Sequence, residues 1–357
     1  VAGGGTVKEV HPPMRQKSYR VQAVKPIAGK KKKHKRVKGY WKRYHSATSN
    51  DKAEHEICKN VCKELGNPYP KNILGRKAKI EPWEIAAMHA FRRHKGFAYR
   101  DVERASKTLL GFFIDHSWVG KTLQRIPPIY FIKAVQLIAG RIKALFIKHD
   151  KNVHIVDSTG ITTDRKAVSK KGKEYMYFMK LHIIIQYWLR LGILVIVTCL
   201  ATGNNVQDGT GMRRMLPDVE GDGDFFGDKG YSGKQNRKKI RQQGFNPQIK
   251  PKGEQSKKEA EKNPFNNDAY KQIRGRIECI FGGTTTRHDN KTKCRLEITR
   301  QNDCNLYALS HNLHTYLRAK IAKITLIWRQ PLFLYGNHYF AEELIVQFRI
   351  SWFSDIC

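Results

Sequence analysis

Three short acidic strings constrain most strongly what this 357-residue chain can fold into. They are HIVDST, which holds Asp157, FFGDKGY, which holds Asp228, and RGRIECIFGG, which holds Glu278. The chain has 67 lysines and arginines against 31 aspartates and glutamates, so carboxylates are scarce in it. Scarce carboxylates in so basic a chain indicate divalent-metal chemistry on a polyanion.

Both aspartates follow runs that are typical of strands. NVHIVD is rich in valine and isoleucine and ends at Asp157, and DFFGD ends at Asp228 before the glycine-bearing loop KGYSG. We therefore predict that both lie at strand C-termini and point into one crevice, where open α/β sheets bind ligands. A lone aspartate at such a place is more often a turn former or a helix cap. The ordered set of three acids favours a shared site.

The segment around Glu278 has the pattern of a helix. Apolar residues recur in it at steps of three and four, namely Tyr270, Ile273, Ile277 and Phe281. One of residues 266–268 is expected to cap the start, and Gly282–Gly283 to end the helix. Arg274 stands one turn before Glu278, so an ordinary surface ion pair is the simpler interpretation of this glutamate taken alone.

Three carboxylates of this kind suit Mg²⁺, with Mn²⁺ as a substitute, because Mg²⁺ prefers hard oxygen ligands and keeps several waters. Two such ions about 3.5–4 Å apart would activate an attacking oxygen and stabilise a leaving one. The strings therefore predict a two-metal site for phosphodiester transfer, with Asp157, Asp228 and Glu278 as metal ligands.

On these strings the chain resembles the DDE transposases of prokaryotic insertion sequences, in the insertion-sequence four/five group. HIVDSTGI, FFGDKGYSG and RGRIECIFGG carry the resemblance, which covers residues 80–320. It implies an RNase H-like core with the first aspartate on the first strand, the second after the fourth strand, and the glutamate on a following helix. It also implies that Asp157, Asp228 and Glu278 are the catalytic residues.

The string around the glutamate departs from the family's pattern in two places. The family has an arginine four residues before the glutamate, which Arg274 matches, and a tyrosine three residues before that arginine, where Tyr270 comes one residue early. It has a basic residue seven positions after the glutamate, where this chain has Thr285. The predicted DNA contacts near the metal site are Lys229, Tyr231, Arg274 and, as the nearest basic substitute, Arg287.

The runs KLHIIIQYW and ILVIVTCLATG predict adjacent strands of a central sheet, and no membrane span is expected because Gln186 and Arg190 interrupt them. The charged stretch KGEQSKKEAEKNPFNN is expected to be an exposed loop.

The predicted fold class is α/β, an RNase H-like mixed-sheet catalytic core preceded by a helical, helix-turn-helix-like DNA-binding region. The predicted domains are a partly disordered basic arm (1–80), the helical region (81–149), the catalytic domain (150–323) and an apolar extension of unknown role (324–357).

Within the helical region, HSWVGKTLQRI predicts a helix with Ser117 as its N-cap. Its apolar and polar side chains divide into two sets, Trp118, Val119, Leu123 and Ile126 on one side and Lys121, Gln124 and Arg125 on the other. A DNA recognition helix and an ordinary amphipathic core helix fit this pattern equally well. The resemblance implies that this region binds the terminal inverted repeats of the element. The apolar helix after Pro127 is expected to pack against the sheet.

The formal net charge is +36 and the pI is near 10.0, which indicates a nucleic-acid partner held through its phosphates. The densest basic run spans residues 30–38 and holds seven lysines or arginines. We favour a DNA-binding arm over a localisation signal of the same composition. The predicted contacts in this arm are Lys31, Lys32, Lys33, Lys35 and Arg36.

Seven cysteines form no disulfide framework and no signal peptide is recognisable, so a cytoplasmic, nucleoid-associated protein is expected. Cys279 is expected to point into the core, about 100° around the helix from Glu278. The apolar segment 324–357 is either a packing or dimerisation element or coding sequence read past an ancestral stop.

These observations predict a transposase that binds its terminal inverted repeats and target DNA, and that cleaves and joins DNA with Mg²⁺. A homodimer is expected when two ends are paired. One rival is a metal-dependent nuclease of the same fold that cuts without joining. The other is a catalytically decayed relative that only binds DNA.

Overall fold

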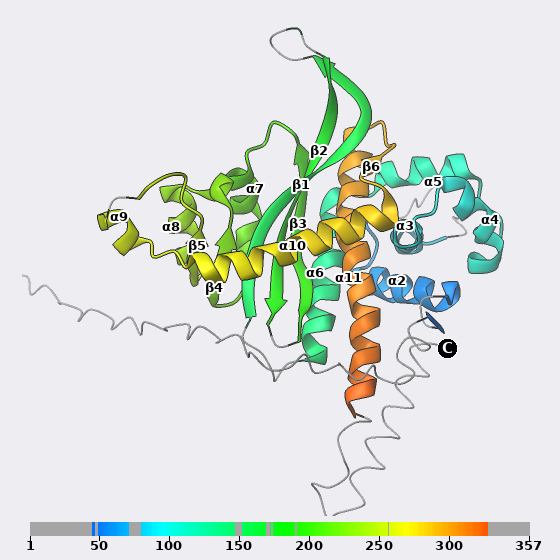
Figure 1. The fold of residues 1–357 in the computed structure, drawn as a ribbon. Coiled ribbons are helices and arrows are strands. Elements are labelled where there is room, and N and C mark those ends of the chain that lie inside the picture. The colour runs from blue at the N-terminus through cyan, green and yellow to red at the C-terminus, as the bar shows by residue number, and fades with distance from the viewer. Residues whose placement is uncertain are drawn as a thin grey trace, which may run out of the picture. The chain divides into compact units, whose positions relative to one another are not determined.

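The computed structural model describes residues 45–46, 49–70, 80–146, 152–168, 172, 174–189, 191–255 and 257–327 (Figure 1). In these ranges the chain begins with helices, which are α2 (Asp51–Leu65), α3 (Pro82–Lys95), α4 (Tyr99–Leu110), α5 (His116–Thr122), the 3-10 turn η1 (Leu123–Arg125) and α6 (Pro128–Leu145). The basic run at 30–38 and most of the apolar extension lie outside the described residues.

A mixed β-sheet follows the helical region. Its strands are β1 (Asn152–Val168), β2 (Glu174–Trp188), β3 (Ile193–Gly203), β4 (Gly223–Gly227), β5 (Phe245–Ile249) and the two-residue β6 (Lys291–Thr292). They lie in the order β3-β2-β1-β4-β5, and β6 pairs with β1. The first three strands form an antiparallel meander, whereas β4 and β5 run parallel to β1. The predicted α/β fold class, with a helical region before a mixed sheet, is confirmed.

Further helices connect and follow the strands. They are α7 (Asp208–Met215), η2 (Leu216–Asp218), η3 (Lys229–Tyr231), α8 (Lys234–Gln242), α9 (Lys257–Lys262), α10 (Asn267–His288) and α11 (Glu297–Ile327). None of the helices in the described residues is long and apolar enough to span a membrane.

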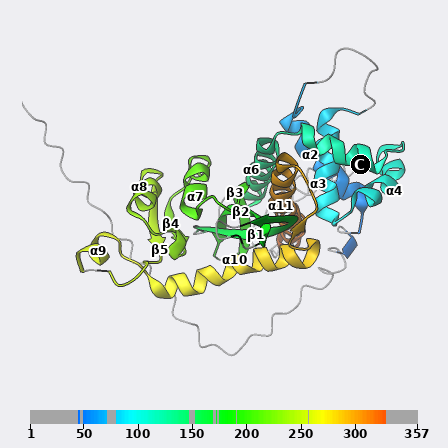
Figure 2. The ribbon, with the colours of Figure 1, turned by 90° about the horizontal axis from the view of Figure 1, so that it is seen from above.

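Both faces of the sheet are covered, because its central strands carry apolar side chains on both sides. On one face Ile155, Ile161 and Ile183 belong to a core that α6, α10 and α11 complete. On the other face Val156 and Ile184 pack against apolar residues of α7 and α8. Figure 2 shows α10 on the opposite side of the sheet from α7 and α8. The end of β1 that precedes Asp157 is therefore held from both sides.

The helical region shares the first of these cores. α6 packs against β3 and α11, as the apolar pattern after Pro127 predicted. A buried ion network also joins α3 to α11. Arg92 Nη2 donates to Asp303 Oδ1 at 2.6 Å, Arg93 donates to the other oxygen of the same carboxylate, and the side chains of all three residues are at most 9% exposed.

Several predicted boundaries are wrong. Strand β1 does not end at Asp157 but continues to Val168, where it forms a long hairpin with β2. α10 passes through Gly282–Gly283 and ends at His288, since Ile280 and the apolar residues before it are anchored in the core. The predicted exposed loop holds the short helix α9, none of whose residues is buried.

Expectations about a helix cap and about the side on which two side chains lie are also corrected. Asp115, not Ser117, caps α5, because its carboxylate accepts the backbone N–H groups of Ser117 and Trp118. Trp118 lies with the exposed residues of α5 rather than with its buried face. The last helix extends to Ile327, past the predicted domain end at residue 323. Cys279 is exposed and does not enter the core.

Candidate active site

Asp157 and Asp228 occupy equivalent positions on neighbouring parallel strands. The pairing of β1 with β4 ends at Val156 and Gly227, and each aspartate is the residue that directly follows in the chain. Both line one small pocket, together with Tyr270 and Arg274 of α10. The sheet thus brings together two acids that lie 71 positions apart in the sequence, at the point where β4 ends and β1 leaves it.

The glycines of the FFGDKGY string are what allow this approach. A Cβ added at Gly227 would lie 2.8 Å from Ile249 Cδ1 and 3.0 Å from Val156 Cγ1, so a larger residue would crowd these side chains on the two neighbouring strands. Asp228 follows the strand and is the N-cap of η3. Its Oδ1 accepts a hydrogen bond from the backbone N–H of Gly230 at 2.7 Å. One oxygen of the carboxylate is thereby fixed by the chain's own backbone.

The electrostatic environment of Asp157 is unusual for an aspartate. Its pKa is raised to about 6, mainly by burial and in addition by the negative charges of Asp228 and Asp208. A hydrogen bond from the Ser158 backbone N–H, 2.8 Å from Oδ1, and the charge of Arg274 oppose this change. The pocket therefore gathers more negative charge than its cation balances, which is the condition that attracts a divalent ion.

Glu278 does not join the two aspartates in this structure. It projects from α10 with 68% of its side chain exposed, and its Oε1 lies 3.2 Å from Nη1 of Arg274. The carboxylate oxygens of Asp157, Asp228 and Glu278 are not all within 4.8 Å of one another. The predicted triplet is thus assembled in part, with the third acid on the helix that borders the pocket. Asn266 caps this helix through a hydrogen bond to the Ala269 N–H.

Sequence reasoning missed a fourth acid near the pair. Asp208 begins α7, and its Oδ1 accepts hydrogen bonds from Ser158 Oγ at 2.7 Å and from Lys180 Nζ at 3.0 Å. Burial would raise the pKa of Asp208, but these two hydrogen bonds and the lysine's charge hold it below its ordinary value. The available signal was the same as for Asp157 and Asp228, an acid shortly after the apolar run ILVIVTCLATG.

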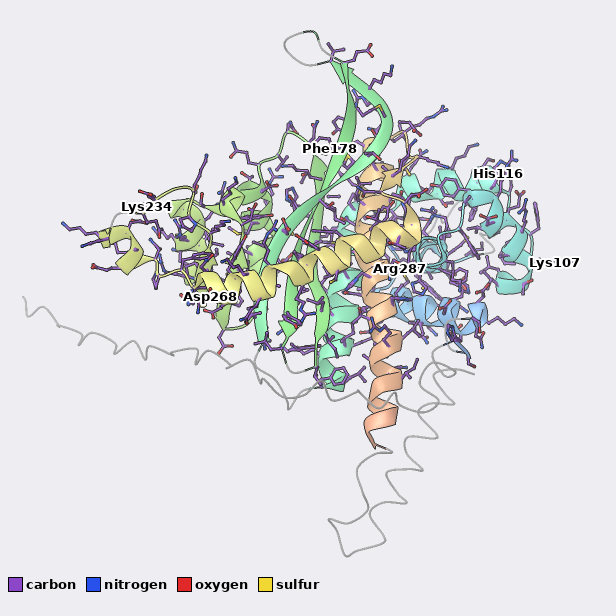
Figure 3. All side chains as sticks on the ribbon, in the orientation of Figure 1. Lys107, His116, Phe178, Lys234, Asp268 and Arg287 are labelled. Atoms are coloured by element: carbon purple, nitrogen blue, oxygen red, sulfur yellow. The ribbon has the colours of Figure 1, made fainter. Side chains whose placement is uncertain are left out.

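The predicted DNA contacts near the site differ in accessibility. Lys229 and Arg287 are exposed, and Figure 3 shows Arg287 near the opposite end of α10 from Asp268. Arg274 is half-buried beside the two aspartates. Tyr231 is only 1% exposed and packs with Val156 in the core below the site, so its predicted contact with DNA phosphate is wrong for this structure.

The polar side of the predicted recognition helix is accessible. Lys121, Gln124 and Arg125 are exposed, while Val119, Leu123 and Ile126 are buried. The helix itself is short, since α5 ends at Thr122 and η1 continues it for one turn. The arm contacts Lys31, Lys32, Lys33, Lys35 and Arg36 lie outside the described residues.

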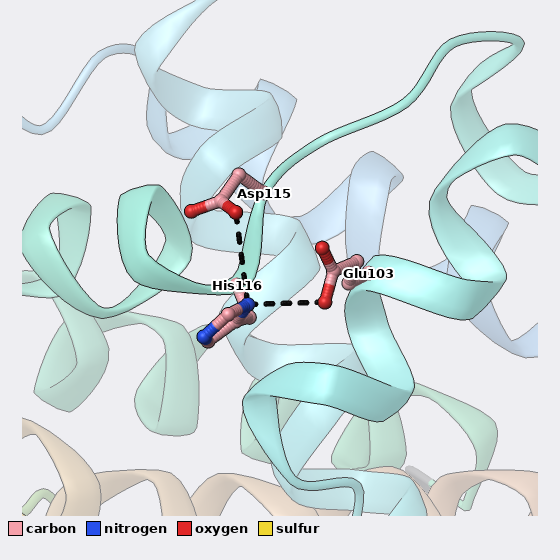
Figure 4. Close-up of side chains that lie close together, drawn as sticks. All are labelled: Glu103, Asp115 and His116. Atoms are coloured by element: carbon pink, nitrogen blue, oxygen red, sulfur yellow. Dashed lines mark hydrogen bonds and ion pairs between the residues drawn. The ribbon is translucent and has the colours of Figure 1, made fainter.

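A second group of possible metal ligands lies on the helical region (Figure 4). Nδ1 of His116 is 3.1 Å from Oε2 of Glu103 and 3.6 Å from Oδ2 of Asp115. Asp115 already serves as the N-cap of α5, and the histidine ties this cap to α4. These contacts describe an exposed helix junction, on different elements from those that hold Asp157 and Asp228.

Comparison with known proteins agrees with the geometry of the sheet. Residues 148–313 match the model of the transposase DDE domain family. The matched segment contains Asp157, Asp208, Asp228 and Glu278. No curated protein matches the chain significantly. This segment, with its mixed sheet and paired aspartates, belongs to the family of transposase DDE domains.

Proposed function

We propose that this chain is the transposase of an insertion sequence, in the insertion-sequence four/five group, that binds the terminal inverted repeats of its element and catalyses metal-dependent DNA cleavage and strand transfer. The observation that carries the proposal is that Asp157 and Asp228, which directly follow the last paired residues of β1 and β4, line one pocket. The match to the transposase DDE domain supports it independently.

The donor set fits a hard divalent cation. Asp157 and Asp228 offer carboxylate oxygens to one pocket in which negative charge is in excess. Mg²⁺ is the proposed ion, in two copies, with Mn²⁺ as a substitute. Bound there, the ions would activate the attacking oxygen and stabilise the leaving one.

Glu278 is the proposed third ligand, and little holds it in its present place. Its partner Arg274 is a half-buried i,i+4 neighbour, the glutamate itself is exposed, and i,i+4 helix pairs contribute only about 0.3–0.5 kcal/mol. The glutamate can therefore exchange this partner for a cation at small cost. Arg274, once released, is a free guanidinium beside the site and suits a DNA phosphate.

DNA binding is proposed to use basic groups on several elements. Lys229 and Arg287 are exposed on the elements that border the pocket, and Lys121, Gln124 and Arg125 are exposed on the helical region. The arm at 30–38 would add phosphate contacts. The net charge of +36 supports long-range attraction to nucleic acid, and the place of action would be the nucleoid. Two element ends must be paired, so a homodimer is proposed.

To test the proposed activity, the purified protein and Mg²⁺ are incubated with a labelled DNA duplex that carries the inverted repeats flanking its gene. Asp157→Ala is compared with Glu261→Gln, which changes an exposed acid on α9. We expect cleavage at the repeat end and joined products from the parent and the control only. Cleavage without joining would favour the nuclease, and binding without cleavage would favour a decayed, DNA-binding-only relative.

A further inference from the structure

Lys250 directly follows β5 and lies beside Asp228 at the edge of the sheet. The pairing of β4 with β5 ends at Gly227 and Ile249, so Lys250 follows β5 as Asp228 follows β4. The backbone N–H of Lys250 donates to the Gly227 carbonyl at 3.0 Å, which continues the contact between the two chain segments by one step. The same edge of the sheet therefore carries Asp157, Asp228 and a lysine after three parallel strands.

The side chain of Lys250 belongs to the face of the sheet that α10 covers. Phe245 and Ile249 of β5 pack in the core on the other face, with residues of α7 and α8, so the residues that alternate with them point towards α10. Gln248 shows this directly, because its Oε1 accepts the backbone N–H of Asn266, the N-cap of α10, at 2.9 Å. Lys250 is the next residue of this set.

The ammonium group of Lys250 lies at the margin of the candidate active site. Its Nζ is 5.8 Å from the centroid of the Tyr270 ring, and Tyr270 lines the pocket together with Asp157 and Asp228. An aromatic ring attracts a cation at this distance. Lys250 is exposed, and among the described residues no carboxylate forms an ion pair with it. Its charge is therefore available to a ligand that enters the pocket.

A phosphate group of DNA is the ligand that fits this lysine. Its nonbridging oxygens share a negative charge, which an ammonium group binds as a point charge. A phosphate that approaches Asp157 and Asp228 meets two carboxylates of its own sign, so it needs several positive charges around it. Divalent ions on the two aspartates would supply part of this charge, and Lys250 supplies more from the neighbouring strand.

We propose that Lys250 binds a nonbridging oxygen of the DNA phosphate at the cleavage point, beside the ions that Asp157 and Asp228 hold. The same contact would stabilise the charge of the phosphate in the transition state. The inference rests on the proposed function, because it assumes metal-dependent cleavage of DNA in this pocket. It adds β5 to the elements that carry residues of the active site.

The test compares cleavage of the labelled terminal-repeat duplex in Mg²⁺ by the full chain and by three variants. Lys250→Met should cleave at least about tenfold more slowly, because a neutral side chain cannot bind the phosphate. Lys250→Arg keeps the charge and should stay within about threefold of the parent. The matched control is Lys239→Met, which changes an exposed lysine of α8 on the opposite face of the sheet and should cleave like the parent.

Metal binding separates a DNA contact from support of the site. Titration calorimetry with Mn²⁺ and without DNA should give Lys250→Met a Kd no higher than that of the parent, since the change removes a positive charge near the ions. If Lys250→Met bound Mn²⁺ more weakly and also cleaved more slowly, the lysine would support the metal site rather than bind DNA, and the inference would be overturned.

Two results of the cleavage assay also overturn the inference. One is cleavage by Lys250→Met at the parent rate, and the other is a Lys250→Arg protein as slow as Lys250→Met, since charge would then not be what the site requires. A parent that cleaves no faster than Asp157→Ala refutes the proposed function and the inference together. Cleavage that depends on Asp157 but not on Lys250 refutes the inference alone.

Discussion

Gly227, the residue before Asp228, packs closely against side chains of both neighbouring strands. It is the last residue of β4, and it packs between Val156 and Ile249 of the strands on either side. Because a Cβ there would meet the side chains of both neighbours at 3.0 Å or less, a larger residue would force these side chains or the backbone of β4 to move. The residue that follows is Asp228, a proposed metal ligand, which a shift of the backbone at Gly227 would displace.

Gly227→Ala should therefore lower the free energy of unfolding by about 1–3 kcal/mol, as overpacked core substitutions do. It should also weaken Mn²⁺ binding. Gly282→Ala is the matched control, because a Cβ at this exposed helical position meets nothing within 4 Å. That change should stabilise α10 by up to about 1 kcal/mol. Urea unfolding of both variants measures the difference, and equal effects would contradict the packing argument.

A substitution of Glu278 should change DNA cleavage without changing the stability of the fold. Its side chain is 68% exposed, so Glu278→Gln should change the free energy of unfolding by less than about 0.5 kcal/mol. Loss of a metal ligand should nevertheless slow DNA cleavage at least about 100-fold. Cleavage rates and urea unfolding are measured on the same preparations, with Glu261→Gln as the exposed control. Cleavage at the parent rate would remove Glu278 from the site.

At the scale of elements, the sequence predicted which segments form the core but not where they end. The β1, β2, β3, β4 and α10 patterns identified the right strands and the right helix. The continuation of β1 past Asp157 was not visible, since residues 158–168 are mostly polar and their strand depends on pairing with β2 and β6. Gly282–Gly283 failed as a stop, because the packing of Ile277 and Ile280 outweighs the low helix propensity of two glycines.

The candidate site, like the helices and strands, could be predicted from the sequence only in part. Asp157 and Asp228 were predicted to share a crevice because each follows an apolar strand run, and they line one pocket although β1 continues past Asp157. The side on which Tyr231 packs and the approach of Asp208 depend on tertiary contacts that no local pattern encodes. The ion pair of Glu278 with Arg274, by contrast, is the i,i+4 pair that the sequence offered. Sequence therefore identified the acids, and only the fold showed which of them share a pocket.

The contact between α3 and α11 should depend on one buried charge. Burial would raise the pKa of Asp303, but the charges of Arg93 and Arg92 hold it below its ordinary value. The stability that this ion network contributes is present above the carboxyl's unfolded pKa and is lost as the pH falls through the lowered value.

Asp303→Asn leaves two buried guanidinium groups without their charged partner and should cost about 3–5 kcal/mol. Glu297→Gln, which removes an acid that is 48% exposed and paired with Arg300, should cost less than about 1 kcal/mol. Chemical denaturation of both variants at neutral pH provides the measurement. Comparable losses would show that the buried network does not hold the two helices together.

For the whole molecule, buried histidines make stability depend on pH. Burial lowers the pKa of several described histidines to about 3 or 4, namely His55, His89, His154, His182, His288, His311 and His314. Their ordinary value is 6.5. Between these values the unfolded chain binds more protons than the folded chain, so the free energy of unfolding falls as the pH is lowered from about 6.5 towards 4.

His154 gives the sharpest test of this effect. Its ring is fully buried between Phe225 and Phe245, and burial lowers its pKa to about 4. His154→Leu removes one titrating group, so the loss of unfolding free energy between pH 7 and pH 4 should shrink by about 3 kcal/mol. Urea titrations at both pH values compare the variant with the parent. An identical pH dependence would mean that this ring does not titrate as its burial requires.

The most direct test of the central claim, that Asp157 and Asp228 bind the catalytic ions together, exchanges a ligand atom. Asp228→Cys replaces a hard oxygen with a soft thiolate, which disfavours Mg²⁺ and accepts Mn²⁺ more readily. We expect the folded variant to lose cleavage of the terminal-repeat duplex in Mg²⁺ and to regain it in Mn²⁺. Cleavage in Mg²⁺ at the parent rate would show that Asp228 does not bind the ion.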